Sequence, residues 1–231
     1  MTSGPRIGFD DSVPLMGFIR RHIEPVDVLD EALFGLIMAV GFTAACRFGL
    51  DEMDSRTLFV SILGCNLAWA LIDGSMYVMT TLYERGRISR LGRSILQAPS
   101  EAEALRRIGA ELDDRFGPVA TPEERQQLSR LVLGMLPRVT ATRPRVKSAD
   151  ALGGLAVALV VLAVTVPVIA PFIVLDDVNL AVRTANLVAT GLLFVLGYRW
   201  SQHAGGHPLA VGLGLATFGF IMVLVTLLLG G

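Results

Sequence analysis

Lysine, histidine and cysteine are scarce in this 231-residue chain, and each shortage narrows the possible functions. Lys147 is the only lysine, so arginine carries almost all of the basic charge. The three histidines and two cysteines form no cluster with the spacing of a zinc site. Cys46 and Cys65 both fall in apolar runs, which favours small packing residues over a structural disulfide.

Charge and aromatic residues are also sparse, at 18% and 7% of the chain, whereas hydrophobic residues make up 52%. A soluble domain of this length normally carries more charge, so the composition predicts a membrane protein. Basic and aromatic residues do not interleave as they do in nucleic-acid binders, which excludes that class of partner. No nucleophile lies near a base in the sequence, and we expect a protein that is not an enzyme and holds no tightly bound cofactor.

What is abundant is long apolar sequence. Because a bilayer core of about 30 Å needs roughly 20 helical residues, five runs predict membrane spans, at about 32–50, 58–81, 152–174, 180–198 and 209–230. The predicted fold is an all-α membrane protein with five transmembrane helices and a three-helix cytoplasmic insertion between helices 2 and 3. The predicted parts are 1–31, 32–81, the insert 82–150, and 151–231.

The basic residues predict the orientation. Most of the 20 lie between the second and third spans or near the start of the chain. The positive-inside tendency therefore predicts that the amino terminus and the insert are cytoplasmic and that the carboxyl terminus is outside, in a bacterial inner membrane. No cleavable signal peptide is evident ahead of the first apolar run. Residues 12–23 mix apolar and basic side chains, which favours a short helix on the membrane surface, with a plain linker as the alternative.

The insert reads as three helices. The first, about 82–96, continues out of the second span; the second follows Ser100 and ends near Phe116; the third follows Thr121 and ends near Leu136. Acidic residues on these helices offer oxygen ligands for a divalent cation, and an ordinary solvated face with surface ion pairs is the alternative. The candidate ligands are Glu101, Glu103, Glu111 and Asp114.

Asp73 is the leading candidate for function, because an aspartate near the centre of a membrane helix costs roughly 2.5–3.5 kcal/mol on insertion scales. Asn66, Asp73, Tyr77 and Thr80 share one helical face, and Met76 lies one turn from Asp73. A carboxylate beside the thioethers of Met76 and Met79 offers hard and soft donors that together suit ferrous iron. The alternative is that Asp73 is a hydrogen-bonded packing residue and that the methionines fill the core.

Several strings resemble the vacuolar iron transporter family. These are EALFG (31–35) at the start of the first span, GSMYVM (74–79) in the second, VPVIAP (166–171) in the third, and the glycines of the last. The resemblance implies five spans, a cytoplasmic metal-binding domain, and a homodimer whose path is lined by the first two spans. It also implies that Met76 lines that path. The family's aspartate falls near Met38 and its glutamate at Thr80, and the insert lacks the family's dense Glu-x-x-Glu runs.

The sequence therefore predicts a transporter that exports divalent iron or manganese from the cytoplasm, in exchange for protons. Its expected transport path comprises Asp73, Met76, Met79, Met38, Asn66 and Thr80. Its expected metal ligands are Asp73 and Met76 with the four acids of the insert. The alternative is a protein of the same fold that does not transport and whose arginine-rich insert binds a partner protein or anionic lipid.

Overall fold

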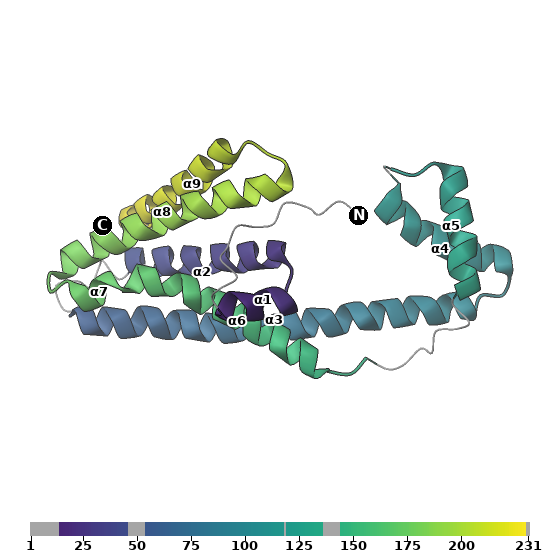
Figure 1. The fold of residues 1–231 in the computed structure, drawn as a ribbon, viewed down its shortest axis with the longest axis horizontal. Helices are drawn as coiled ribbons and strands as arrows, with labels where there is room; N and C mark the ends of the chain where they lie inside the picture. The colour runs from purple at the N-terminus through teal and green to yellow at the C-terminus, as the bar shows by residue number, and fades with distance from the viewer. Residues whose placement is uncertain (1–13, 46–53, 118, 136–143, 230–231) are drawn as a thin grey trace. The chain divides into compact units, whose positions relative to one another are not determined.

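The structure is a computed structural model that describes residues 14–45, 54–117, 119–135 and 144–229, and all its regular structure there is helical (Figure 1). The helices are α1 (Pro14–His22), α2 (Pro25–Ala45), α3 (Ser55–Leu96), α4 (Glu101–Phe116), α5 (Pro122–Met135), α6 (Ser148–Ile169), α7 (Pro171–Val174), α8 (Val178–Ala204) and α9 (Pro208–Leu229). The prediction of an all-α protein is confirmed for these residues.

Four of these helices, α3, α6, α8 and α9, are long and apolar enough to cross a membrane. They correspond to the second to fifth predicted spans. The first, 32–50, begins inside α2, and its residues 46–50 lie outside the described residues. At 1.5 Å per residue, the 42 residues of α3 extend about 63 Å, roughly twice the thickness of a bilayer core.

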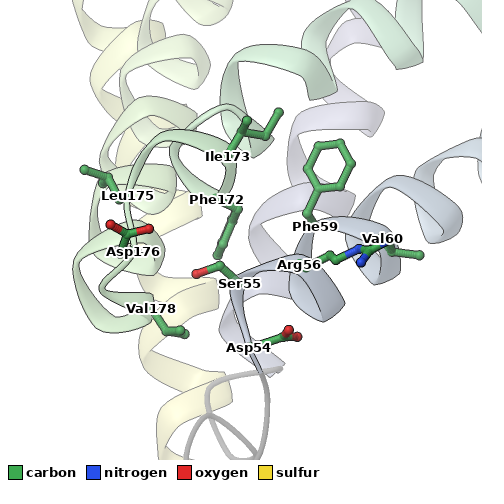
Figure 2. Close-up of a pocket in the computed structure, with 10 residues that line it drawn as sticks. All are labelled: Asp54, Ser55, Arg56, Phe59, Val60, Phe172, Ile173, Leu175, Asp176 and Val178. Atoms are coloured by element: carbon green, nitrogen blue, oxygen red, sulfur yellow. The ribbon is translucent and has the colours of Figure 1, made fainter.

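The third predicted span, 152–174, is interrupted. The helix α6 ends at Ile169 and the short helix α7 begins at Pro171, which has no backbone N–H to continue the ladder. Beside this break lies an open hollow of about 740 Å³, between the start of α3 and the chain from α7 to α8 (Figure 2). We call it the α7 hollow; Asp54, Arg56 and Phe59 line one side, and Phe172 and Asp176 line the other.

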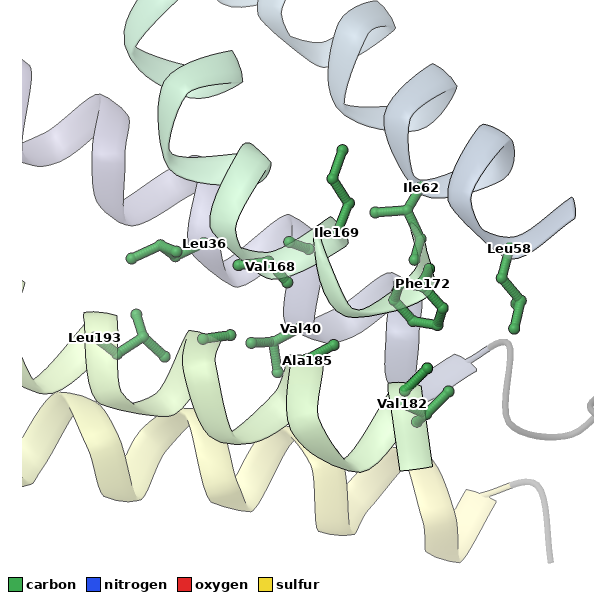
Figure 3. Packing of buried hydrophobic residues seen from close by; sticks show 13 residues of the cluster. Leu36, Val40, Leu58, Ile62, Val168, Ile169, Phe172, Val182, Ala185 and Leu193 are labelled. Atoms are coloured by element: carbon green, nitrogen blue, oxygen red, sulfur yellow. The ribbon is translucent and has the colours of Figure 1, made fainter. Parts of the chain in front are cut away.

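The chain divides into two compact units. Unit 1 comprises 1–78 and 148–231, and unit 2 comprises 79–147, so α3 runs through both. The core of unit 1 joins α2, α3, α6, α7 and α8 through Leu36, Ile62, Val168, Phe172 and Leu193, each at most 4% exposed (Figure 3).

Three glycines bring α2 and α3 close to α6. A Cβ atom on Gly35 would lie 2.8 Å from the Val164 side chain and 3.2 Å from the Val161 carbonyl oxygen. A Cβ on Gly74 would lie 2.5 Å from the Gly154 carbonyl oxygen, and the reverse contact is equally short. Small residues permit this approach of membrane helices, so α6 is the helix against which both α2 and α3 are positioned.

Unit 2 has its own small core of Ile95, Ala104, Ile108 and Leu112. Its helices begin where the sequence predicts. The Ser100 hydroxyl accepts a hydrogen bond from the Glu103 backbone N–H, and Thr121 and Glu124 form a reciprocal capping box. The backbone and side-chain hydrogen bonds with Thr121 hold the pKa of Glu124 below its usual value.

Candidate functional site

Polar groups of α2 and α3 lie buried in unit 1 and lack the partners that such groups normally require. The Asn66 side chain is fully buried; its Nδ2 donates to the Ile62 carbonyl oxygen at 3.0 Å, whereas its Oδ1 has no partner among the described residues. Asp73 Oδ2 and Glu31 Oε2 are likewise buried without a hydrogen bond there. These three residues define the polar cluster, whose unused groups are all oxygen acceptors.

The spacing of the residues explains how the polar cluster forms. Glu31 lies one turn before Gly35 on α2, and Asp73 directly precedes Gly74 on α3. Because both glycines touch α6, the two carboxyl groups are brought toward each other. They are close enough for the charge of Asp73 to act on Glu31, more strongly than the charges of Asp27 and Asp30 do.

The electrostatic character of the polar cluster is therefore acidic. Asp27 and Asp30, which also act on Glu31, are exposed on the first turns of α2. Burial of like charges without a cation is costly, so such carboxyl groups hold a proton or a bound cation. The arrangement can exchange protons for cations.

A hydrogen bond places the polar cluster relative to the short helix α1. The Tyr77 hydroxyl donates to the His22 carbonyl oxygen at 3.2 Å, at the junction of α1 and α2. Tyr77 lies one turn beyond Asp73, and its ring fills the space beside Gly153, where a Cβ would lie 2.3 Å from it. This contact and the Gly74–Gly154 crossing fix the rotation of α3, so that Asn66 and Asp73 face inward.

The other residues predicted for the path lie elsewhere on their helices. Met76 is 53% exposed, so its thioether does not share the buried side of α3 with Asp73. Met38 is partly buried on α2. Met79 and Thr80 belong to unit 2 and are both exposed. The atoms of the polar cluster that lack a described partner are therefore all oxygens.

The acids of unit 2 are engaged in ion pairs with arginines. Glu103 contacts Arg107 at 2.9 Å and also Arg106, and Glu111 contacts Arg87 at 3.2 Å. Glu101 is exposed in the first turn of α4, and the side chain of Asp114 lies outside the described residues. No three His, Cys, Asp or Glu side chains gather as a metal site within the residues that the structure describes.

The α7 hollow is a second polar feature of unit 1, at the other end of the inward face of α3. Eighteen residues separate Ser55 from Asp73, which corresponds to about 27 Å along the helix. Ser55 Oγ is buried there without a described partner. The pKa of Asp54 lies below its usual value, because the side chain and the backbone N–H of Thr57 form hydrogen bonds with it.

Two acidic residues of unit 1 were not singled out by the sequence analysis. Glu31 is the last acid before the first predicted span, a position that could have marked it. Asp150 is 3% exposed in the first turn of α6. Its position in the sequence, just before the third predicted span, did not indicate that it would be buried. Pairing between helices is what makes Glu31 notable, and the sequence of one helix does not contain that information.

Comparison with models of known protein families found no match for this chain, and neither did a search of curated proteins.

Proposed function

We propose that the chain is a dimeric five-span membrane transporter, with a cytoplasmic insertion between the second and third spans, that moves a divalent cation in exchange for protons. It would export iron or manganese from the cytoplasm, as the resemblance to vacuolar iron transporters implies. The observation that carries the proposal is the pair of Glu31 and Asp73, each of which has one buried carboxylate oxygen without a hydrogen bond to the described residues.

In this mechanism Glu31 and Asp73 together hold a proton and a divalent cation in turn. Without a cation, a proton offsets the repulsion of the two buried carboxyl groups. A divalent cation replaces that proton and is held by the carboxylate oxygens of Glu31 and Asp73. Protonation from the opposite side then displaces the cation. The movement of the cation is coupled to that of the proton because the two carboxyl groups cannot hold both at once.

The approach to the pair is acidic as well. Asp27 and Asp30 lie exposed on the first turns of α2, and both act electrostatically on Glu31. Fixed negative charges raise the local concentration of cations at such an entrance. At the other end of the inward face of α3, the α7 hollow with Asp54 and Asp176 provides an opening for departure.

The donor set narrows the choice of ion. Oxygen donors suit manganese, whereas ferrous iron gains from a softer ligand. Met76 is more than half exposed and would have to turn inward to supply sulfur. We therefore expect manganous ion to be moved at least as well as ferrous ion.

The test is uptake of Mn²⁺ and Fe²⁺ into proteoliposomes with an imposed pH gradient. The wild type should move the ion and dissipate the gradient. Asp73→Asn and Glu31→Gln should each lower the rate roughly tenfold or more, the effect of losing about 1.4 kcal/mol of interaction. Glu123→Gln, which changes an exposed acid in the first turn of α5, should transport normally. Full activity of Asp73→Asn would refute the proposal.

A second candidate function has its own support in unit 2. The pairing of Glu103 and Glu111 with arginines means that a metal would have to displace guanidinium groups there. This favours a module that binds a partner protein or anionic lipid. Absence of transport by the wild type under every gradient, together with retention of an insert partner, would favour this function.

A further inference from the structure

We propose that Phe172 of α7, together with Leu58 and Ile62 of α3, forms an apolar gate between the polar cluster and the α7 hollow. The gate is closed in this structure, and it opens when α7 moves away from α3. The proposal deepens the proposed function and rests on it in one respect, that Asp73 exchanges its ion with the side of the hollow.

One side of α3 carries polar groups at two levels and apolar groups between them. Ser55 and Asp73 are about five helical turns apart and therefore share this side, with Asn66 between them. Each of the three has a buried atom without a partner among the described residues. Leu58 and Ile62 lie between Ser55 and Asn66 on the same side and are at most 1% exposed. A route along this side of α3 therefore crosses an apolar barrier.

The ring of Phe172 completes this barrier from α7. It is 4% exposed and belongs to the same buried cluster as Leu58 and Ile62 (Figure 3). It also lines the α7 hollow (Figure 2). The same side chain therefore bounds the hollow and fills the core beside α3. Hydrated ions and water do not enter a passage filled with apolar side chains, because they would lose their hydrogen-bond partners there.

The segment that carries Phe172 is separated from the helices on both sides of it. The helix α7 has four residues; α6 ends at Ile169 before it, and α8 begins at Val178 after it. Pro171 has no backbone N–H to continue the hydrogen bonds of α6. Beyond Phe172, the rest of α7 is 68–78% exposed and so packs little. A short segment between two breaks can move while α6 and α8 stay intact, as hinged elements do.

A gate on this side is what exchange at Asp73 requires. If the polar cluster were open to both sides at once, protons would cross without a cation and the coupling would be lost. Asp27 and Asp30, which act on Glu31, are exposed at the start of α2, whereas the way from Asp73 to the hollow is filled. The structure therefore corresponds to the state that is closed toward the hollow.

The first experiment measures whether a thiol at position 66 can be reached from the side of the hollow. Asn66→Cys is introduced after both cysteines are replaced by serine, in sealed vesicles of uniform orientation. A membrane-impermeant methanethiosulfonate is added on the side at which Asp176→Cys, at an exposed residue of the hollow, reacts. Asn66→Cys alone should label slowly. Adding Phe172→Ala or Ile62→Ala should speed labelling roughly tenfold or more, because truncating a buried side chain favours local opening.

The matched control is Leu193→Ala. It removes a fully buried side chain from the same cluster, but on α8 rather than between α3 and α7 (Figure 3). Leu193→Ala should loosen the packing as Ile62→Ala does and yet leave Asn66→Cys slow to label. Labelling that Phe172→Ala and Ile62→Ala do not speed would overturn the gate. Equal acceleration by Leu193→Ala would also overturn it, because loss of packing alone would then explain the result.

A second measurement uses a substitution that keeps most of the side-chain volume. Leu58→Asn places an amide in the barrier and should let water enter it, so a pH gradient across metal-free proteoliposomes should decay faster than with the wild type. Leu193→Asn is the control and should not speed the decay. If Phe172→Ala fails to fold, this comparison still decides, and equal decay in Leu58→Asn and the wild type refutes the gate.

Both measurements are made without a divalent cation, so the gate and the transport activity can fail separately. A wild type that moves no cation, with labelling that depends on Phe172, would refute the proposed function and support the barrier. A wild type that transports, with labelling that ignores Phe172, would refute the gate alone.

Discussion

The acids of the two units differ in whether they form ion pairs with arginine among the described residues. In unit 2, Glu103 and Glu111 are engaged by guanidinium groups at 2.9 and 3.2 Å. In unit 1, Glu31 and Asp73 have buried oxygens without a described partner, and the negative charges of Asp73, Asp27 and Asp30 act on Glu31. Paired acids stabilise a fold or leave it unchanged, whereas unpaired buried acids destabilise it. The difference teaches that stability gives no reason for the presence of Glu31 and Asp73 in unit 1.

The largest effect should come from removing the unpaired acid. Asp73→Leu deletes a buried oxygen that has no described partner and places an apolar side chain in a membrane helix. We expect the free energy of unfolding in detergent to rise by about 1–3 kcal/mol. Asp176→Leu, at an exposed position, is the control and should change little. A loss of stability in Asp73→Leu would mean that Asp73 is a satisfied packing residue.

A smaller effect of opposite sign is expected in unit 2. Glu103→Gln breaks the ion pairs with Arg106 and Arg107, and because these are partly exposed we expect a loss of up to about 1 kcal/mol. The measurement is hydrogen exchange of the α4 amides. Glu101→Gln removes an acid from the same first turn without a described pair, so the difference between the two isolates the ion pairs. Identical exchange in both variants would contradict the contrast between the units.

The smallest effect should be a pH dependence at the start of α5. Because the pKa of Glu124 is lowered in the folded protein, its contribution is present above the usual value of 4.5 and is lost as the pH falls through the lowered pKa. Wild type should therefore be more resistant to denaturant than Glu124→Gln at pH 6, and the gap should close at lower pH. A difference in stability between the two proteins that widens on acidification would contradict a lowered pKa of Glu124.

Local signals in the sequence predicted much of this fold. Ser100, Thr121 and Pro122 marked the helix starts, since capping depends on residues within one turn. The insertion cost of a charge also pointed to Asp73, which does have a buried oxygen without a partner.

Features that depend on contacts between helices could not be predicted from the sequence. Asp73 acts on Glu31 because α2 and α3 both approach α6 at glycines. The hydrophobic periodicity of a single helix does not say how that helix is rotated relative to its neighbours. Met76 was grouped with Asp73 by its spacing, yet its side chain is 53% exposed in the structure.

The most direct test of the central claim is calorimetric binding of Mn²⁺ to the purified protein in buffers of different ionisation enthalpy, which counts the protons released. The account predicts that the wild type binds Mn²⁺ with release of protons, because the ion replaces protons held by Glu31 and Asp73. It also predicts that Asp73→Asn loses both the binding and the release. Binding by Asp73→Asn that equals the wild type, with the same proton count, would contradict it.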